Sequence, residues 1–328
     1  MENIRWGIIG AGRISAEFAA ALLRTQGTQL AAVASRDQDR AREFAGRFGI
    51  TRAYGSYEEL VEDQEVDVIY IGTPHSEHKK NAMLCLNHGK HVLCEKAFTL
   101  NEEDTAQLIE MAGDKGLFLM EAMWTKFHPV TNKVKEWIDQ GRIGAVRLMN
   151  ISFGFKSEFN QEDRLFNKSI GGGALLDVGI YPVTYAVHMM GEMPVSVSGS
   201  AYLGKTGVDE VNNVQMQFAN GAIAVLSSAI SVNLGQEGVL IGEKGKIVLD
   251  RFFMAQKAEI YDNEGRLTER YEEPFLVNGY EYEIMEVNRC IQGHKTQSRV
   301  NPLENTRNIM RLLDQIRSQW GLVYPQEK

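Results

Sequence analysis

The chain has 328 residues, of which 44% are hydrophobic and 24% are charged, a composition typical of a globular protein with about two domains. Its 35 basic and 43 acidic side chains give a net charge of −8, which argues against a nucleic-acid or membrane-surface binder. No apolar run approaches the roughly 18 residues of a membrane span, and we expect no secretion signal. The three scattered cysteines, Cys85, Cys94 and Cys290, indicate neither a disulfide framework nor a cysteine metal site. We therefore expect a reducing, cytoplasmic location.

The first 120 or so residues predict alternating strands and helices. Short apolar runs indicate buried strands at 4–9, 30–34, 68–71, 91–94 and 117–120. Helical spacing of apolar residues predicts a helix over 37–48, and a capping box at Ser56–Glu59 begins another. This alternation is typical of right-handed βαβ units. We expect an α/β Rossmann domain with a doubly wound parallel sheet over residues 1–122.

The pattern changes in the remaining residues, 123–328. A helix is expected at 129–140, a strand at 146–155 and a glycine-led helix at 171–190. Short strands then follow, with a hairpin at Asn220-Gly221 between 213–218 and 222–230, and further strands at 238–241, 246–249 and 257–261. These elements predict an α+β domain with an open, mainly antiparallel sheet, for substrate binding and dimerisation. The last helix, 302–319, is a candidate to pack back on the first domain.

A glycine loop follows the first strand and begins the next helix, and it runs Gly10-Ala11-Gly12-Arg13-Ile14-Ser15. Gly10 permits a tight turn, Gly12 lets the backbone approach a pyrophosphate, and the small Ser15 lets the helix lie near the strand. The helix N-terminus offers its free N–H groups to phosphates. An ordinary glycine turn is the alternative, but the setting inside a βαβ unit favours dinucleotide binding.

The end of the second strand bears on which dinucleotide is bound. NAD sites place an acidic residue there, whereas this chain has Ser35-Arg36. A hydroxyl and a guanidinium suit the 2′-phosphate of NADP. Asp37, a candidate N-cap of the next helix, is acidic, so NAD remains the alternative.

Three further segments together resemble one known family. They are Thr73-Pro74 with His78, Glu95-Lys96, and Gly171-Gly172-Gly173 with Asp177 and Tyr181. With the glycine loop, they resemble the glucose–fructose oxidoreductase/inositol dehydrogenase (Gfo/Idh/MocA) family over nearly the whole chain. Ala97 stands where the family usually has the proline of Glu-Lys-Pro. Tyr181 stands where many members have histidine, and with Trp124 and Arg164 it resembles the dihydrodiol and xylose dehydrogenase branch.

The resemblance implies hydride transfer between NADP, or NAD, and a secondary alcohol or carbonyl of a sugar, polyol or cyclic trans-diol. The alternatives are a non-catalytic nucleotide-binding regulator on the same scaffold and a reductase of anhydro-sugars or ketoses. A regulator needs no proton relay, so the presence of both Lys96 and Tyr181 favours an enzyme. The residues expected to bind the cofactor are Gly10, Gly12, Arg13, Ile14, Ser35, Arg36, Thr73, Pro74, His78, Glu95, Lys96, Trp124 and Arg164.

Lys96, Tyr181 and Asp177 are the candidate catalytic residues. A phenol with a pKa near ~10 is a poor base at neutral pH, and the ammonium of Lys96 would lower the pKa of Tyr181. Asp177 lies four residues before Tyr181, so an α-helix would put both on one face, where Asp177 would bind a substrate hydroxyl or Lys96. Asp177 and Tyr181 are also expected to bind substrate. Trp124 and Phe153 are expected to bind it as aromatic walls, with a place in a domain-interface core as the alternative.

Two further expectations concern partners. The run Ala222–Leu226 is apolar at successive positions, which indicates a strand buried on both faces and hence a homodimer formed through the second sheet. The His75/His78 and His88/His91 pairs lack a third ligand at suitable spacing, so we expect no metal.

Overall fold

The computed structural model describes residues 3–327, which divide into two compact units. The first unit contains the residues up to Trp124 together with Leu276–Met310, and the second contains Thr125–Phe275 and the residues from Arg311 onward. The sequence analysis placed residues 123–328 in the second domain, with the helix 302–319 as a candidate to pack back on the first. In the structure the whole of Leu276–Met310 belongs to the first unit, whereas the residues from Arg311 onward belong to the second.

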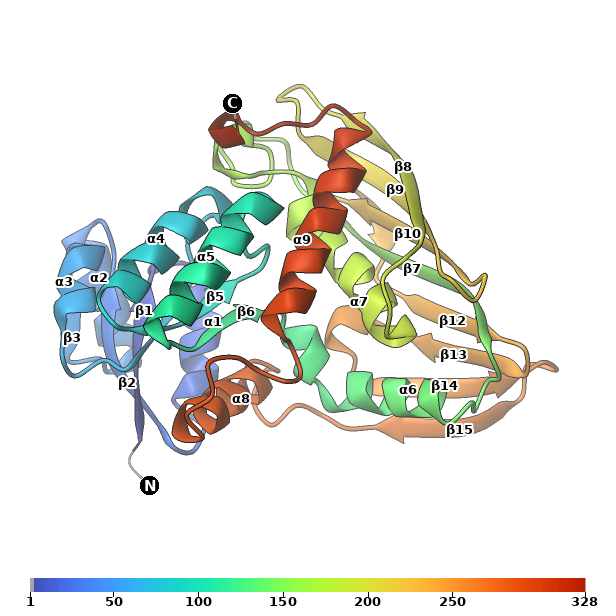
Figure 1. The fold of residues 1–328 in the computed structure, drawn as a ribbon, viewed down its shortest axis with the longest axis horizontal. Helices are drawn as coiled ribbons and strands as arrows, with labels where there is room; N and C mark the ends of the chain where they lie inside the picture. The colour runs from blue at the N-terminus through green and yellow to red at the C-terminus, as the bar shows by residue number, and fades with distance from the viewer. Residues whose placement is uncertain (1–2, 328) are drawn as a thin grey trace. The chain divides into compact units, whose positions relative to one another are not determined.

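The first unit is built on a six-stranded parallel sheet with the order β3-β2-β1-β4-β5-β6, which confirms the doubly wound prediction (Figure 1). Its strands are β1 (Ile4–Ile9), β2 (Thr28–Ala34), β3 (Arg52–Tyr54), β4 (Val68–Ile71), β5 (His91–Glu95) and β6 (Leu119–Ala122). The helices between them are α1 (Arg13–Leu22), α2 (Gln38–Phe48), α3 (Tyr57–Glu62), α4 (His75–Asn87) and α5 (Glu102–Lys115).

Alternation along the strands separates the two faces of this sheet. Ile9, Ile69 and Ile71 belong to a buried apolar cluster shared with α3, α4 and α5. On the other face the Trp6 ring lies 5.5 Å from Phe18 of α1, which stacks on Tyr70 at 3.7 Å. Both faces are therefore covered, as the continuous apolar strands predict.

The returning segment completes this second face and one edge of the sheet. It contains α8 (Glu281–Gln292) and the start of α9 (Leu303–Ser318). The Trp6 Nε1–H donates to Asn288 Oδ1 of α8 at 3.1 Å, and Asn301 donates to the carbonyl of Glu121 at 3.0 Å. The sequence analysis did not predict α8, because its buried face includes three acidic residues that interrupt the apolar pattern, Glu281, Glu283 and Glu286.

The second unit is built on a nine-stranded sheet, in which β11 pairs with β7 beside the main path β15-β14-β13-β12-β7-β10-β9-β8. Among the described pairs only β10 with β7 is parallel, so the mainly antiparallel prediction is confirmed. The strands are β7 (Val146–Lys156), β8 (Ser196–Leu203), β9 (Asp209–Gln217), β10 (Ile223–Ala229), β11 (Ser231–Gly235), β12 (Gly238–Gly242), β13 (Gly245–Leu249), β14 (Lys257–Asp262) and β15 (Leu267–Glu272). The predicted hairpin at Asn220-Gly221 joins β9 to β10.

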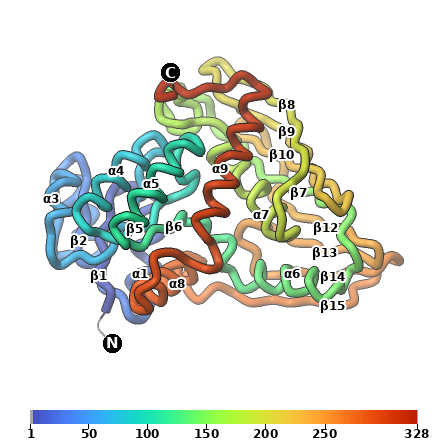
Figure 2. The backbone as a smooth tube through the Cα atoms, in the orientation of Figure 1, coloured from blue at the N-terminus to red at the C-terminus, as the bar shows by residue number. Residues whose placement is uncertain are grey.

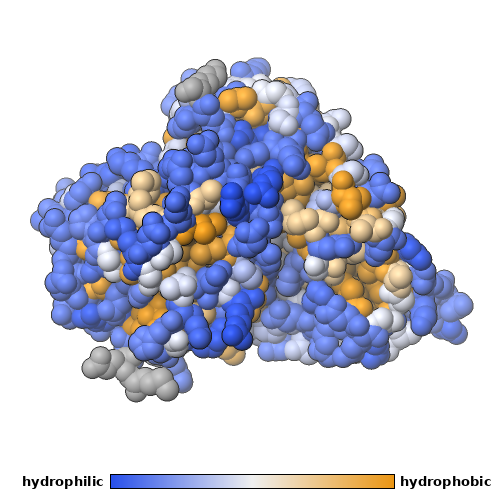
Figure 3. Space-filling view, in the orientation of Figure 1, coloured by the Kyte–Doolittle hydropathy of each residue, from blue (hydrophilic) through white to orange (hydrophobic). Residues whose placement is uncertain are grey.

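Helices cover one face of the second sheet (Figures 1 and 2). They are α6 (Pro129–Asp139), the π-helix η3 (Leu175–Gly179) and α7 (Ile180–Met190). The described residues also form short 3₁₀ helices, η1 (Trp124–Phe127), η2 (Lys168–Ile170), η4 (Phe252–Met254) and η5 (Pro325–Glu327). Along β10, Ala224 and Leu226 are buried whereas Ile223 and Val225 are half-buried, so its second face is less covered. Hydrophobic side chains are also visible over this unit in the space-filling view (Figure 3).

The segment Lys168–Met190 is long and apolar enough to cross a membrane by length and composition alone. The sequence analysis found no such run. In the structure 89% of its most apolar window is buried inside the fold, so packing in the second unit accounts for its apolar character.

Candidate active site

The carboxyl ends of the parallel strands meet at one edge of the first sheet, which is the ligand-binding edge of open α/β sheets. The structure gathers at this edge, or within a few residues of it, most of the residues predicted to bind the cofactor. They are Gly10, Gly12, Arg13 and Ile14 after β1, Ser35 and Arg36 after β2, Thr73 and Pro74 after β4, Glu95 and Lys96 at the end of β5, and Trp124 after β6.

The loop after β1 has the geometry that a pyrophosphate requires. Gly10 has φ +98°, and a Cβ there would lie 3.0 Å from the carbonyl oxygen of Gly72. No described side chain caps α1 at Gly12, and a Cβ there would meet no described atom within 4 Å. The first N–H groups of α1 thus receive no side-chain cap from Gly12, as in helix N-termini that bind an anion. Gly72 and Ser15 approach so closely that a Cβ on Gly72 would lie 2.4 Å from Ser15 Oγ, which explains the need for small residues.

Two guanidinium groups lie near the end of β2. The carboxylate of Asp37 accepts from the N–H groups of Asp39 at 2.9 Å and Arg40 at 3.2 Å, so it caps α2 as expected. Burial raises the pKa of Tyr57, and the positive charges of Arg36 and Arg40 lower it. Both arginines therefore lie close to this one ring. The sequence analysis missed Arg40, although its spacing of four residues from Arg36 was the available signal.

Buried groups hold the loop that carries Lys96, which is half-buried at the end of β5. The Tyr70 hydroxyl donates to Glu95 Oε1 at 2.6 Å, and the Lys96 N–H donates to Glu95 Oε2 at 3.2 Å. The fully buried ring of His78 lies 2.8 Å from the carbonyl oxygens of both Thr73 and Ala97. Glu95 and His78 thus hold in place the loops that follow β4 and β5 at the carboxyl edge of the sheet. The Lys96–Ala97 peptide bond is cis.

The sequence analysis did not single out two further buried residues of the first unit, Tyr280 and Glu283. The Trp124 ring stacks on Tyr280 with centroids 4.6 Å apart. Glu283 of α8 is fully buried, and within residues 3–327 neither carboxyl oxygen has a hydrogen-bond partner. Burial raises the pKa of Glu283 well above its usual value, and the charges of Glu95 and Glu121 raise it further. Because α8 itself was not predicted, no local pattern could have linked Glu283 to Glu95.

In the second unit an aromatic cluster surrounds Tyr181 of α7. The Phe153 and Phe253 rings stack with centroids 4.0 Å apart, and each centroid lies 5.6 Å from that of Tyr181. Phe153 was a predicted wall, whereas Phe253, in η4, was missed. Nearby in sequence, Arg164 donates to Asp177 Oδ1 at 2.6 Å, with Asp177 buried and Arg164 exposed. The structure thus gives Arg164, expected at the cofactor, a carboxylate partner in its own unit.

Asp177 lies in a π-helical turn, η3, directly before α7. A π turn closes i→i+5 hydrogen bonds, and the helical segment continues without a break from Asp177 into α7 and Tyr181. The glycines before the turn are required by close contacts. A Cβ on Gly172 would lie 2.8 Å from the carbonyl oxygens of Asn167 and Leu165. The expected glycine-led helix is thus a tightly packed glycine segment followed by a π turn.

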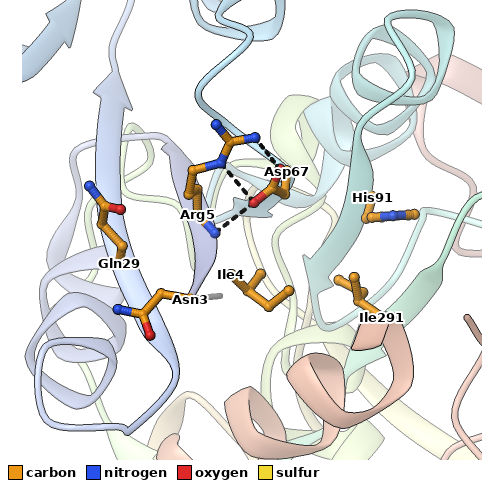
Figure 4. A pocket seen from close by; sticks show the side chains of 7 residues that line it. All are labelled: Asn3, Ile4, Arg5, Gln29, Asp67, His91 and Ile291. Carbon is orange, nitrogen blue, oxygen red and sulfur yellow. Dashed lines mark hydrogen bonds and ion pairs between the residues drawn. The ribbon is translucent and has the colours of Figure 1, made fainter. Parts of the chain in front are cut away.

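A hollow of about 660 Å³ opens on the first unit at the opposite edge of its sheet, where the strands begin (Figure 4). Arg5 and Asp67, which line it, bind each other, with Nε to Oδ2 at 3.0 Å and a terminal nitrogen to Oδ1 at 2.6 Å. Ligands of open parallel sheets bind at the carboxyl ends of the strands, so we do not assign the reaction to this hollow.

Comparison with known proteins agrees with this geometry. Residues 4–123 match the family described as "Oxidoreductase family, NAD-binding Rossmann fold". Residues 131–248 match the family described as "GFO/IDH/MocA C-terminal domain". The trans-1,2-dihydrobenzene-1,2-diol dehydrogenase of Danio rerio is 36% identical, with 99% of each chain covered. The human protein of the same name is 34% identical, again with 99% of each chain covered.

Solved structures give the same result. A 3-ketoreductase from Actinomadura kijaniata in complex with NADP and TDP-benzene has a TM-score of 0.89 at 26% identity, covering 97% of this chain and 98% of the other. Its solved variants include lysine replaced by alanine and tyrosine replaced by phenylalanine. An aldose–aldose oxidoreductase from Caulobacter crescentus shares the fold, with a TM-score of 0.89 at 23% identity, covering 98% of this chain and all of the other. The chain therefore belongs to the Gfo/Idh/MocA family of oxidoreductases and is an NAD(P)-dependent dehydrogenase or reductase.

Proposed function

We propose that this enzyme uses NADP in preference to NAD and acts on a secondary alcohol, or the matching carbonyl, of a cyclic trans-diol, sugar or polyol. The observation that carries the substrate class is the aromatic cluster of Phe153, Tyr181 and Phe253, which offers ring faces beside a phenol hydroxyl. The names of the relatives from Danio rerio and human, diol dehydrogenases of similar length, agree with it. The ketoreductase that resembles this chain supports, by its name, action on the carbonyl form of the substrate.

The charge at the end of β2 supports NADP. Arg36 and Arg40 lie near one ring there, and a 2′-phosphate accepts charged hydrogen bonds from guanidinium groups. Asp37, the acidic side chain that an NAD ribose would need, is used as the cap of α2. NADP in the similar ketoreductase agrees with this assignment. The residues that would hold the pyrophosphate are Gly10, Gly12, Arg13 and Ile14, with Thr73 and Pro74 from the loop after β4.

We assign the proton transfer to Lys96 and Tyr181. When bound, the nicotinamide supplies the hydride chemistry, and this chain must move the hydroxyl proton. The phenol of Tyr181 would take that proton as base, or give it as acid in the reverse direction, and the ammonium of Lys96 would favour the phenolate. The lysine and tyrosine variants of the similar ketoreductase support these two residue types. Asp177, held by Arg164, would orient a substrate hydroxyl, and Trp124 would add a further aromatic wall.

Four variants test this proposal on a panel of cyclic trans-diols, sugars and keto-sugars, assayed with NADP and NAD by nicotinamide absorbance. Tyr181→Phe keeps the ring and loses the proton carrier, so turnover should fall about 10²–10⁴-fold while NADP affinity persists. The turnover of Lys96→Met should fall at least as far, and the turnover of the double variant should be little lower than that of either single variant. Tyr185→Phe is the matched control on α7, because the buried Tyr185 hydroxyl has no hydrogen-bond partner within residues 3–327.

The proposal fails if wild type turns over no member of the panel. It also fails for Tyr181 if Tyr181→Phe keeps more than about half of a chemistry-limited wild-type rate. In that case the proton carrier would have to be sought in Asp177 or Lys96.

We further propose that the protein is a homodimer formed through the less covered face of the second sheet. The half-buried Ile223 and Val225 of β10 support it, as do the exposed Tyr202 of β8 and Val232 of β11 in the same sheet. The free, buried Cys85, Cys94 and Cys290 suit a reducing compartment such as the cytoplasm.

A further inference from the structure

Asp209, the first residue of β9, is fully buried in the second unit. Its Oδ2 accepts two hydrogen bonds, from the N–H of Leu175 at 2.7 Å and from Asn212 Nδ2 at 2.8 Å. Asn212 in turn accepts from the Ser228 hydroxyl of β10 at 2.8 Å. A chain of buried polar groups therefore runs from the sheet to the first residue of η3.

The other oxygen of Asp209 lies against the glycine segment. Within residues 3–327 Oδ1 has no hydrogen-bond partner, and a Cβ on Gly173 would lie 2.3 Å from it. Gly173 has φ +121°, a conformation that a side chain would strain. Asp209 thus lies against Gly173, two residues before the turn, and accepts a hydrogen bond from the first N–H within it.

Neither Ala174 nor Gly179, the residues at the N-cap positions of η3 and α7, provides a side-chain cap. The first N–H groups of a helix need acceptors, and a carboxylate near them also interacts favourably with the helix dipole. Asp177 lies two residues after Leu175, and Tyr181 lies six residues after it. The place of both side chains therefore depends on how firmly this first turn is held.

We propose that Asp209 is a positioning residue, whose buried carboxylate fixes the first turn of the segment that carries Asp177 and Tyr181. This rests on the proposed function, because it assigns Asp209 a role through Tyr181. Displacement of a catalytic group by about 1 Å can cost roughly 10²-fold in rate, so loss of the acceptor should reduce turnover without touching the cofactor loop of the first unit.

The titratable group facing Asp209 is Tyr324 of the C-terminal segment, whose hydroxyl donates to the Gly172 carbonyl at 2.9 Å. Burial and the charge of Asp209 raise the pKa of Tyr324, Arg317 lowers it and Glu327 raises it. Burial raises the pKa of Asp209 itself to about 7, against the lowering effect of its hydrogen bonds.

Three variants test the proposal, Asp209→Leu, Asp209→Asn and, as a matched surface control on α6, Asp139→Leu. We expect Asp209→Leu to lower kcat by about 10- to 100-fold with the KM for NADP within twofold, and Asp209→Asn, which keeps an oxygen acceptor, to recover most of that loss. Hydrogen–deuterium exchange of amides 174–181 should be at least tenfold faster in Asp209→Leu and unchanged in Asp139→Leu. Equal kcat, or equal exchange, in wild type and Asp209→Leu overturns the proposal.

A further measurement covers a failure of Asp209→Leu to fold. In protein labelled with ¹⁵N-leucine, the Leu175 amide proton should move downfield as the carboxylate ionises, and this titration should be absent in Asp209→Asn. A Leu175 amide that does not titrate in wild type overturns the proposal. Exchange and amide shifts need no substrate, so they decide the role of Asp209 separately from a failure of the substrate panel.

Discussion

Arg36 and Asp37 are neighbours with opposite charges, and their side chains have different roles in the structure. Asp37 caps α2 with its carboxylate, whereas Arg36 is exposed beside the end of β2. A helix cap contributes about 1 kcal/mol to stability wherever it occurs. The acidic residue of this pair is therefore explained by local structure, and the basic residue is available for the cofactor.

Arg36→Ala should weaken NADP binding by about ten- to a hundred-fold, because a charged hydrogen bond contributes about 1.5–3 kcal/mol. NAD, which has no 2′-phosphate, should bind the variant and wild type alike. Titration of both cofactors into both proteins measures this, with Arg24→Ala on the same unit as control. Unchanged NADP affinity would remove Arg36 from the cofactor site.

A second residue-scale prediction concerns Asp209 and pH. Its pKa is about 7 in the folded protein against 3.8 as the ordinary value, so between these values the folded state holds a proton that the unfolded state has lost. The contribution of Asp209 to stability is therefore present at low pH and is lost as the pH rises from about 4 to about 7, by a few kcal/mol. Thermal melts should show wild type losing stability relative to Asp209→Asn between about pH 4 and pH 7. A constant difference between the two proteins would contradict this.

At the scale of elements, signals confined to a few residues were sufficient. The cap at Asp37, the turn at Asn220-Gly221 and the apolar strands of the first sheet each appear where the sequence placed them. Elements that depend on distant partners were not predictable in this way. Glu283 of α8 is buried and its pKa responds to Glu95 and Glu121, far earlier in the chain. The extra residue of the π turn at Leu175–Gly179 leaves no periodic signature. The same limit applied to Phe253 and Asp209, whose partners Tyr181 and Leu175 lie far earlier in the chain.

The glycine segment before η3 gives a prediction at this scale. In Gly172→Ala the new methyl would meet three carbonyl oxygens, those of Asn167, Leu165 and Arg164, at 2.8–2.9 Å. The segment must then move, so we expect a melting temperature lower by several degrees and a kcat lower by tenfold or more.

Gly113→Ala is the control for this substitution. Gly113 lies within α5, and a Cβ there would meet no described atom within 4 Å. Because alanine is favoured over glycine in a helix by about 1 kcal/mol, this variant should melt slightly higher and keep full activity. If Gly172→Ala behaved like Gly113→Ala, the close packing of the glycine segment would not matter for the site.

At the scale of the whole molecule, light scattering tests the proposed dimer. At micromolar concentration we expect about twice the chain mass of 36.8 kDa. Replacing Val225 of β10 by glutamate should shift the protein towards the single-chain mass, because a charge buried in an apolar interface has no partner. A wild type that stays at the single-chain mass as the concentration rises would rule the dimer out.

The return of Leu276–Met310 to the first unit also has a consequence for how the protein is made. Trp6 and Glu121 obtain their partners Asn288 and Asn301 only after the strands β7 to β15 have left the ribosome. Translation proceeds at roughly 5–20 residues per second, so the nascent cofactor-binding sheet waits on the order of ten seconds or more with its Trp6 face uncovered. During this interval the unfinished protein presents an aromatic surface of the kind that chaperones bind, and the synthesis of α8 determines when that exposure ends.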